Sequence, residues 1–266
     1  MEWLQILVLA AVQGLTEFLP VSSSAHLILV PVLTSWEDQG LAFDVALHVG
    51  SLTAVIIYFR KEILQIVQSS LAVFKGKAVN EDARLGLWII VATLPVCIIG
   101  FLLQDVISNY MRSTLVIGIS LIGFGLLLGY ADYFKRGTKS EYQMGWKEVL
   151  IIGFSQALAL IPGTSRSGIS MTAALMVGMS REGAARFSFL LSIPVIVLAG
   201  GLEAIKLLRQ PQTIDWFSLF AGTLLSGVIA YLCIHYFLVI IKKIGMQPFV
   251  VYRVLFGAWL IWFFHF

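Results

Sequence analysis

The sequence predicts an all-α membrane protein that crosses the bilayer several times, and three observations carry that prediction. Hydrophobic residues make up 59% of the 266 residues, and the mean hydropathy is +0.90. Charged residues make up only 12%, about half of their usual share in a soluble domain. Such a chain cannot cover a folded surface with polar groups, and it is too hydrophobic to be intrinsically disordered. A soluble globular protein and a disordered chain are therefore excluded.

Six apolar stretches are long enough to cross the hydrocarbon core of a bilayer, which takes about 20 residues of helix. They are residues 44–59, 86–103, 115–134, 187–208, 216–241 and 248–266. The amino-terminal apolar stretch carries Glu2 in place of a basic segment and has no signal-peptidase site, so we expect it to be retained. The predicted fold is a helical bundle with six transmembrane helices.

Two further apolar stretches are too short to span, because a polar break that contains proline interrupts each of them. The first runs over residues 3–19 and resumes at 27–33, and the second runs over 149–161 and resumes at 169–179. The breaks read PVSSSAH at 20–26 and PGTSRSG at 162–168. Non-helical backbone at membrane depth is tolerated only where protein or a water-filled cavity satisfies it. We therefore predict two re-entrant pairs of half-length helices.

The two breaks begin equivalent halves, about 1–134 and 145–266, of a single integral-membrane domain. GLTEFLPVSS at 14–23 aligns with QALALIPGTS at 156–165 at a constant offset of 142 residues. Interrupted helices at corresponding positions of two halves indicate a binding site near the middle of the membrane.

Lysine and arginine lie mostly on one side of this predicted topology. The segments 60–84, 135–147, 181–186 and 242–243 carry 13 of the 18 basic residues, whereas the other side has only Arg112, Lys206 and Arg209. The positive-inside rule makes the basic side cytoplasmic and places both termini outside. The two breaks then enter from opposite sides, which predicts an inverted repeat.

Arg166 lies within the second break, at a depth where an ionised side chain costs at least about 2.5–3.5 kcal/mol on insertion scales. Hydroxyls, a guanidinium and the free N–H groups of a helix that starts here form a site for an anion such as phosphate. The alternative is a structural ion pair with a glutamate of the bundle. The residues around Arg166 are hydroxyl-bearing or are glycines, which allow close approach of the backbone to a ligand: Gly163, Thr164, Ser165, Ser167 and Gly168.

The first break carries a carboxylate, hydroxyls and an imidazole. Gln13 and Glu17 are four residues apart and share one helix face. Ser22, Ser23, Ser24 and His26 follow them. Such groups supply a nucleophile, a base and a metal-binding or orienting group, although serines also cap helices and a histidine also packs. Together the two breaks predict a cavity for phosphoryl chemistry.

The roles of two other polar residues at membrane depth stay open. His48, with Asp44 nearby, either packs in the bundle or supports the site. Arg253 lies nearer a helix end and either has a structural role or extends its guanidinium towards the interface. The sequence contains no P-loop, dinucleotide-binding or zinc-protease motif, and we expect no nucleic-acid partner.

The two breaks resemble the two signature boxes of the bacterial undecaprenyl-pyrophosphate phosphatase family, the bacitracin-resistance type. The boxes are QGLTEFLPVSSSAH at 13–26 and PGTSRSG at 162–168, and the similarity extends over essentially the whole chain. The resemblance implies hydrolysis of the lipid undecaprenyl pyrophosphate to undecaprenyl phosphate and inorganic phosphate. This reaction recycles the lipid carrier for peptidoglycan synthesis and confers bacitracin resistance. The resemblance also implies the bacterial inner membrane, with the active site open to the periplasmic or outer face.

The resemblance assigns functional residues one by one. The family's acidic element falls on Gln13 and Glu17, its essential serine and histidine on Ser23 and His26, and its second-box serine and arginine on Ser165 and Arg166. It also implies a divalent cation, Mg²⁺ or Ca²⁺. Many members have glutamate where this chain has Gln13, so Glu17 would bind the metal together with the substrate's own phosphates.

The expected mechanism follows from these assignments. Ser23 attacks the terminal phosphorus or positions the attacking water, His26 manages the proton, and Glu17 holds the cation. Arg166 and Ser165 stabilise charge on the transferred phosphoryl group, and Ser22, Ser24, Gly163, Thr164, Ser167, Gly168 and Gln13 complete the phosphate-binding site. Membrane lipids surround the bundle, and a homodimer is left open.

A transporter or flippase of a phosphorylated lipid or anion is the alternative, because inverted repeats with broken helices are typical of transporters. A transporter needs Arg166 to bind an anion, but it has no use for a Ser23–His26 pair. Release of phosphate in detergent, where no second compartment exists, distinguishes the two functions.

Overall fold

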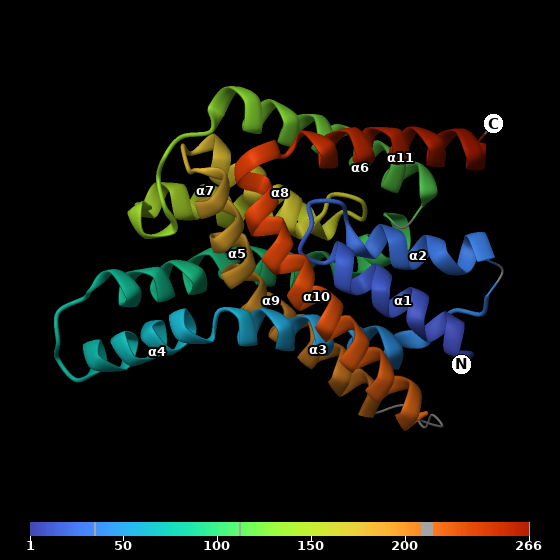
Figure 1. Cartoon of the computed structure of the whole chain (residues 1–266), viewed down its shortest axis with the longest axis horizontal. Coiled ribbons are helices and arrows are strands. Elements are labelled where there is room, and N and C mark those ends of the chain that lie inside the picture. The colour runs from blue at the N-terminus through green and yellow to red at the C-terminus, as the bar shows by residue number, and fades with distance from the viewer. Residues whose placement is uncertain (35, 112, 209–214, 266) are drawn as a thin grey trace.

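The computed structural model describes residues 1–34, 36–111, 113–208 and 215–265. These residues form a bundle of α-helices joined by short turns (Figure 1). The helices are α1 (Trp3–Thr16), α2 (Ser23–Thr34), α3 (Gly40–Tyr58), α4 (Arg60–Phe74), α5 (Glu81–Tyr110), α6 (Thr114–Tyr130), α7 (Trp146–Ala157), α8 (Arg166–Met176), α9 (Arg181–Leu208), α10 (Trp216–Ile244) and α11 (Gln247–His265).

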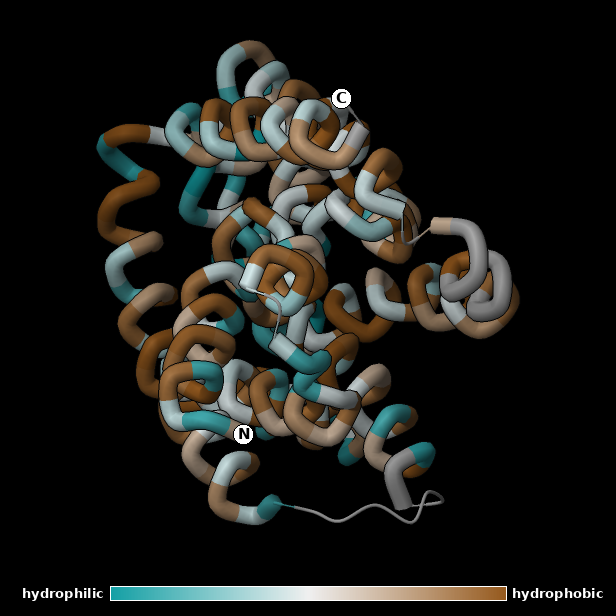
Figure 2. The backbone as a smooth tube through the Cα atoms, turned by 90° about the vertical axis from the view of Figure 1, so that its right-hand side faces the viewer, coloured by the Kyte–Doolittle hydropathy of each residue, from teal (hydrophilic) through white to brown (hydrophobic). Residues whose placement is uncertain are grey.

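The six predicted spans are confirmed within the described part of the chain. Helices α3, α5, α6, α9, α10 and α11 are each long and apolar enough to cross a membrane, whereas α1 and α2 are apolar but short. Hydrophobic residues occur along most of the tube in Figure 2. The protein is therefore an all-α, multi-pass membrane protein, as predicted.

Most helices begin before the apolar stretch that predicted them. α5 begins at Glu81, because the Asn80 side chain accepts a hydrogen bond from the Ala83 N–H and the acidic first turn suits the helix dipole. α6 continues as a π-helical turn, Ala131–Lys135. Hydropathy marks the part of a helix that fits the bilayer core, not its polar ends. Residue 266, the last of the predicted sixth span, lies outside the described residues.

The segment 60–84 contains a helix that the sequence analysis missed. It was predicted only to lie on the basic side of the membrane, and most of it forms α4, which packs on α5 through the buried Ile66. Ile66 faces Gly86 of α5, where a Cβ atom would lie 2.7 Å from the Ile66 side chain. The charged residues of α4 hide it from a hydropathy window, although its apolar residues repeat with helical spacing.

The two interrupted segments enter the bundle from opposite ends (Figure 1). α1 and α2 run from the end where both termini lie to the centre and back. α7 and α8 enter from the other end, where the backbone of Met179 pairs with that of Lys139. The basic segments lie towards this second end, as the lysine and arginine pattern predicts. Arg112 and Arg209, which were expected at the first end, lie outside the described residues.

Helix contacts between the two halves match each other. α1 packs along α10 and α7 packs along α5, while α6 pairs with α11 and α3 with α9. If each helix is replaced by its counterpart in the other half (α1 by α7, α3 by α9, α5 by α10 and α6 by α11, and the reverse), the α1–α10 contact becomes the α7–α5 contact. The α6–α11 and α3–α9 contacts stay the same. This arrangement brings the turn between α1 and α2 against the turn between α7 and α8.

Candidate active site

The first break begins where α1 ends and carries Glu17 at its start. The Glu17 N–H still donates to the Gln13 carbonyl at 3.0 Å, but the chain then turns, and α2 begins at Ser23. Ser22, directly before α2, has a φ of +75°, which is uncommon for a residue other than glycine. The turn aims the Ser23 hydroxyl back at Glu17, and Ser23 Oγ donates to Glu17 Oε2 at 2.7 Å.

The second break has the same construction. Ile161, before Pro162, is extended (φ −78°, ψ 118°), because a proline ring disfavours helical geometry in the preceding residue. Ser165, directly before α8, has a φ of +71°, and its Oγ caps the helix by accepting from the Gly168 N–H at 3.1 Å. Arg166 is the first residue of α8.

The two breaks are equivalent at an offset of 143 residues, one more than the sequence alignment gave. Ser22 and Ser165 share the positive φ and the position before a helix. Ser22 Oγ and Ser24 Oγ lie 3.3 Å apart, as Ser165 Oγ and Ser167 Oγ lie 3.2 Å apart. The second break has one more residue between its proline and its helix. The counterpart of Ser23 is therefore Arg166, and the expected match of Ser23 with Ser165 is wrong.

Glu17 joins the two breaks. Arg166 Nη2 donates to Glu17 Oε1 at 2.8 Å, and the Gln13 amide donates to Glu17 Oε2 at 3.2 Å. The Glu17 side chain is only 8% exposed, and a buried carboxylate needs such donors to remain charged. The structural ion pair that was left as an alternative for Arg166 therefore exists. It lies between the two breaks and not within ordinary bundle packing.

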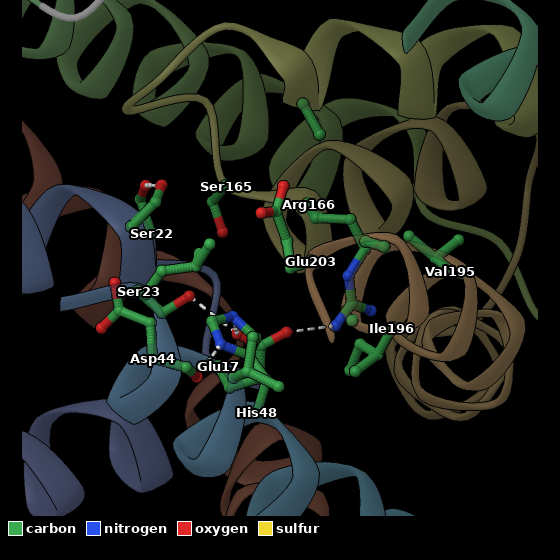
Figure 3. Close-up of a pocket in the computed structure, with 16 residues that line it drawn as sticks. Glu17, Ser22, Ser23, Asp44, His48, Ser165, Arg166, Val195, Ile196 and Glu203 are labelled. Atoms are coloured by element: carbon green, nitrogen blue, oxygen red, sulfur yellow. Dashed lines mark hydrogen bonds and ion pairs between the residues drawn. The ribbon is translucent and has the colours of Figure 1, made fainter. Parts of the chain in front are cut away.

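A cavity of about 360 Å³ opens beside this ion pair (Figure 3). Its polar lining is Glu17, Ser22, Ser23, Ser24, Asp44, His48, Ser165, Arg166 and Glu203. Its apolar lining comes from α3, α9 and the 3-10 turn Leu158–Leu160 that follows α7: Leu41, Val45, Ala159, Val195, Ile196, Ala199 and Gly200. Six of the residues predicted for the site, Ser24 among them, therefore line one cavity.

Five other predicted residues lie away from the cavity. Gln13 and Thr164 are completely buried, and Ser167 Oγ donates to the Leu19 carbonyl at 2.8 Å, which ties the two breaks together. The glycines serve packing within the protein, because a Cβ atom on Gly163 would lie 2.5 Å from the Ile117 carbonyl oxygen and one on Gly168 would lie 2.7 Å from the Arg253 guanidinium. The close backbone approaches that these glycines allow include contacts within the protein.

His26 also lies outside the cavity lining. Its Nδ1 donates to the Ser22 carbonyl at 2.7 Å, and its Nε2 lies 2.6 Å from the Tyr252 hydroxyl. Its ring stacks on Phe256 at 4.8 Å between centroids. Both ring nitrogens are thus occupied by protein groups. None of the described hydrogen bonds joins His26 to the Ser23 hydroxyl.

Three cavity residues were not predicted as site residues: Asp44, His48 and Glu203. His48 Nε2 lies 3.9 Å from Glu17 Oε2, and its Nδ1 donates to the Asp44 carbonyl at 2.8 Å. Glu203 forms an ion pair with Lys206 at 3.0 Å. The sequence contains a signal for two of these residues, because Asp44 and His48 are polar residues one helical turn apart on an apolar span. For His48, support of the site is therefore the better of the two readings.

Arg253 does not extend to the interface. It is completely buried, and its guanidinium donates to carbonyl groups of both breaks and of α6. The partners are Pro20 at 3.1 Å, Gly163 at 3.1 Å, Thr164 at 2.8 Å and Leu121 at 3.2 Å. Five N–H donors in a fixed fork suit such a cluster of carbonyls. Of the two readings left open for Arg253, the structural role holds.

A divalent cation would find only part of a site in these residues. In the described part of the chain, no three His, Cys, Asp or Glu side chains converge on one point. The cavity lining nevertheless carries three carboxylates, Glu17, Asp44 and Glu203, against the single guanidinium of Arg166. An anionic ligand would meet excess negative charge there. This donor set fits a cation that is bound mainly by the ligand's own oxygens, as Mg²⁺ commonly is beside phosphates.

The fold and the site define a class of protein. An apolar bundle surrounds a cavity in which hydroxyl groups, a carboxylate and a guanidinium meet at two helix starts, and this arrangement suits a membrane protein that acts on an anionic group. The family described as bacitracin resistance protein BacA matches residues 6–259. The chain belongs to that family.

Three relatives are similar over nearly their full length. The chain is 53% identical to the undecaprenyl-diphosphatase of Nitrosococcus oceani over 264 residues, which is 99% of this chain and 100% of the relative. It is 54% identical to the undecaprenyl-diphosphatase of Thioalkalivibrio sulfidiphilus over 265 residues, with the same coverage. It is also 53% identical to undecaprenyl-diphosphatase 1 of Pseudoalteromonas translucida over 261 residues, 98% of each chain.

Proposed function

We propose that the chain is an undecaprenyl-diphosphatase, which hydrolyses undecaprenyl pyrophosphate to undecaprenyl phosphate and inorganic phosphate. The observation that carries this proposal is the chain of contacts from Ser23 through Glu17 to Arg166, in one cavity of an apolar bundle (Figure 3). A hydroxyl, a carboxylate and a guanidinium within reach of one another support the roles of nucleophile, proton acceptor and phosphate-binding cation. The reaction recycles the lipid carrier of peptidoglycan synthesis, and it accounts for bacitracin resistance in the family.

Ser23 is the group that attacks the terminal phosphorus or orients the attacking water. Its hydroxyl proton points at Glu17 Oε2, 2.7 Å away, so Glu17 is placed to accept that proton as the P–O bond forms. The bond between phosphorus and the bridging oxygen then breaks, and undecaprenyl phosphate leaves with that oxygen. If a phosphoserine forms, water cleaves it in a second step and releases inorganic phosphate.

Arg166 stabilises the negative charge that moves during this transfer. Its guanidinium can donate two parallel hydrogen bonds to a phosphate. The described hydrogen bonds use only part of its N–H groups, one to Glu17 and one to the Ser188 carbonyl at 3.1 Å. The N–H groups at the starts of α2 and α8 add partial positive charge on both sides. Removal of one such donor typically lowers kcat by about 10²–10³.

His26 contributes from outside the cavity in this mechanism. It holds the Ser22 carbonyl at the start of α2, and that contact fixes the strained residue directly before the nucleophile. The proton from Ser23 goes to Glu17, because Glu17 is within hydrogen-bonding distance of it and both nitrogens of His26 have other partners. His26 is thus a positioning residue and not the general base.

A divalent cation, Mg²⁺ or Ca²⁺, is part of the proposed reaction. Glu17 would be its protein ligand, and the pyrophosphate would supply most of the other oxygens. When bound, the cation would neutralise phosphate charge that the acidic cavity lining cannot. We place the protein in the bacterial inner membrane with the cavity open to the periplasmic side, since the cavity lies towards the end of the bundle that is poor in lysine and arginine.

Phosphate release tests the proposal directly. Purified protein in detergent should release phosphate from undecaprenyl pyrophosphate, and EDTA should stop the release until Mg²⁺ or Ca²⁺ is added back. A transporter would release none, because detergent leaves no second compartment and transport breaks no bond. Release that continues unchanged in EDTA would remove the cation from the mechanism but not the hydrolysis.

A further inference from the structure

The glycines of the helices fall into two groups. At most of them a Cβ atom would meet another atom of the protein within 4 Å, or the backbone has a positive φ that favours glycine. Gly123, Gly200 and Gly201 meet neither condition among the described residues. Glycine in a helix interior is about 0.5–1 kcal/mol less stable than alanine. A helical glycine that neither packing nor backbone conformation requires therefore calls for another reason.

Gly200 lies on the wall of the active-site cavity. Val195, Ile196, Ala199 and Gly200 line the cavity together, and their spacing places them on one face of α9. Figure 3 shows Val195 and Ile196 on the side of the cavity where Arg166 lies. Side chains become smaller along this face, from valine and isoleucine to alanine and glycine. The small residues leave open space where a larger side chain would otherwise fill the wall.

The wall formed by α3 is mixed, because Asp44 and His48 lie there beside apolar residues. Leu41 and Val45 of α3 line the cavity, and α3 packs beside α9. Another face of α9 carries exposed apolar residues, Leu198, Leu202 and Ile205. The cavity therefore has a polar end at Glu17 and Arg166 and most of its apolar lining on α9.

We propose that Gly200, with Ala199 beside it, forms the passage through which the prenyl chain of the substrate leaves the cavity for the bilayer. This inference rests on the proposed function, because it needs a substrate with an anion at one end and a long hydrocarbon at the other. The anion belongs at the polar end, so the first isoprene units must run along the α9 wall. A cavity of about 360 Å³ holds the head group and a short part of the chain, and the rest must pass through an opening. Branched isoprene units need the width that glycine leaves.

Two glycine variants of matched chemistry test the passage. Gly200→Leu narrows it, and Gly123→Leu is the control, because Gly123 is equally open but lies on α6, outside the cavity lining. Steady-state kinetics would use undecaprenyl pyrophosphate and dimethylallyl pyrophosphate, whose chain is a single isoprene unit. We expect Gly200→Leu to raise the KM for the long substrate about tenfold or more relative to that for the short one, and Gly123→Leu to leave this ratio as in the wild type.

A binding measurement keeps the test independent of turnover. The Kd of undecaprenyl phosphate, the proposed product, should rise in Gly200→Leu and not in Gly123→Leu, even if no phosphate is released by any variant. An inactive wild type with this binding pattern would refute the proposed hydrolysis and still support the passage. An unchanged KM ratio and Kd in Gly200→Leu would overturn the passage. Equal loss of activity on both substrates would also overturn it, because the new side chain would then obstruct the phosphate end.

Discussion

The two breaks share a backbone design and differ in the side chain that each places at the cavity. In both, a serine with positive φ directly precedes a helix, and its hydroxyl lies near that of a serine two residues later. The first residue of the helix is Ser23 in one break and Arg166 in the other, and both side chains contact Glu17. The same geometry thus presents a hydroxyl, the proposed nucleophile, from one side and a guanidinium from the other.

This difference shows which features of the site depend on backbone and which on chemistry. The caps and the strained serines fix where two side chains point, while the identity of the first helical residue decides what each can do. Glu17 belongs to one break only and serves both, since it accepts from Ser23 and pairs with Arg166. The sharpest tests of the site are therefore substitutions that change a side-chain group and keep the backbone conformation, or the reverse.

The largest effect is expected for Ser23→Ala. This change removes the attacking hydroxyl and leaves the backbone of the break intact, so phosphate release from undecaprenyl pyrophosphate should fall to background while thermal unfolding in detergent stays near that of the wild type. Ser24→Ala is the matched control, because Ser24 also lines the cavity but makes no contact with Glu17 among the described hydrogen bonds. An active Ser23→Ala variant beside an inactive Ser24→Ala variant would move the nucleophile by one residue.

Arg166→Ala should lower kcat by about 10²–10³, the usual cost of losing one electrostatic donor to the transition state. Arg166→Lys should also be poor, because an ammonium group cannot reproduce the planar fork that spans Glu17 and the Ser188 carbonyl. Kinetics of phosphate release measure both variants. Activity near the wild-type level in Arg166→Ala would refute the assignment of this side of the cavity.

Arg253 should affect stability more than Arg166 does. It reaches both breaks but touches only carbonyl groups, so Arg253→Met would leave several buried acceptors without donors, at about 1–3 kcal/mol each. We expect a lower melting temperature in detergent and an activity loss that lower temperature partly reverses. Arg166→Ala serves as the comparison, since its loss should be catalytic at every temperature. An Arg253→Met variant with wild-type melting would show that the breaks hold together without it.

Much of this arrangement could be predicted, because the membrane penalises polar groups so heavily. Glu17, Ser23 and Arg166 stood out as polar residues in stretches that are otherwise apolar, and the prolines marked where each helix stops. α4 escaped notice because hydropathy does not detect an amphipathic helix.

The errors within the site have a different cause. His26 is close to Ser23 in sequence but faces Tyr252 of α11, whereas His48 comes from a separate helix and reaches Glu17. Nearness along the chain does not determine which face a residue presents after a strained turn. The offset of 142 failed for a related reason, since an extra residue with positive φ, Gly163, lies in the second break, and no apolar pattern records backbone conformation.

The smallest effect is expected for paired substitutions of Ser165, which separate its backbone from its hydroxyl. Ser165→Ala removes the cap on the Gly168 N–H and keeps a Cβ atom at φ +71°, so it should lose about 0.5–2 kcal/mol of stability. Ser165→Gly also removes the cap, but glycine adopts positive φ without strain and is a tolerable capping residue, so its melting temperature should lie above that of Ser165→Ala. Activity should instead follow the hydroxyl. Because Ser165 lines the cavity beside Arg166, both variants should lose about tenfold or more in kcat/KM, as expected when a hydrogen bond to a charged group is lost. A Ser165→Gly variant with full activity would mean that this hydroxyl only caps α8, and that the second break contributes Arg166 alone to the chemistry.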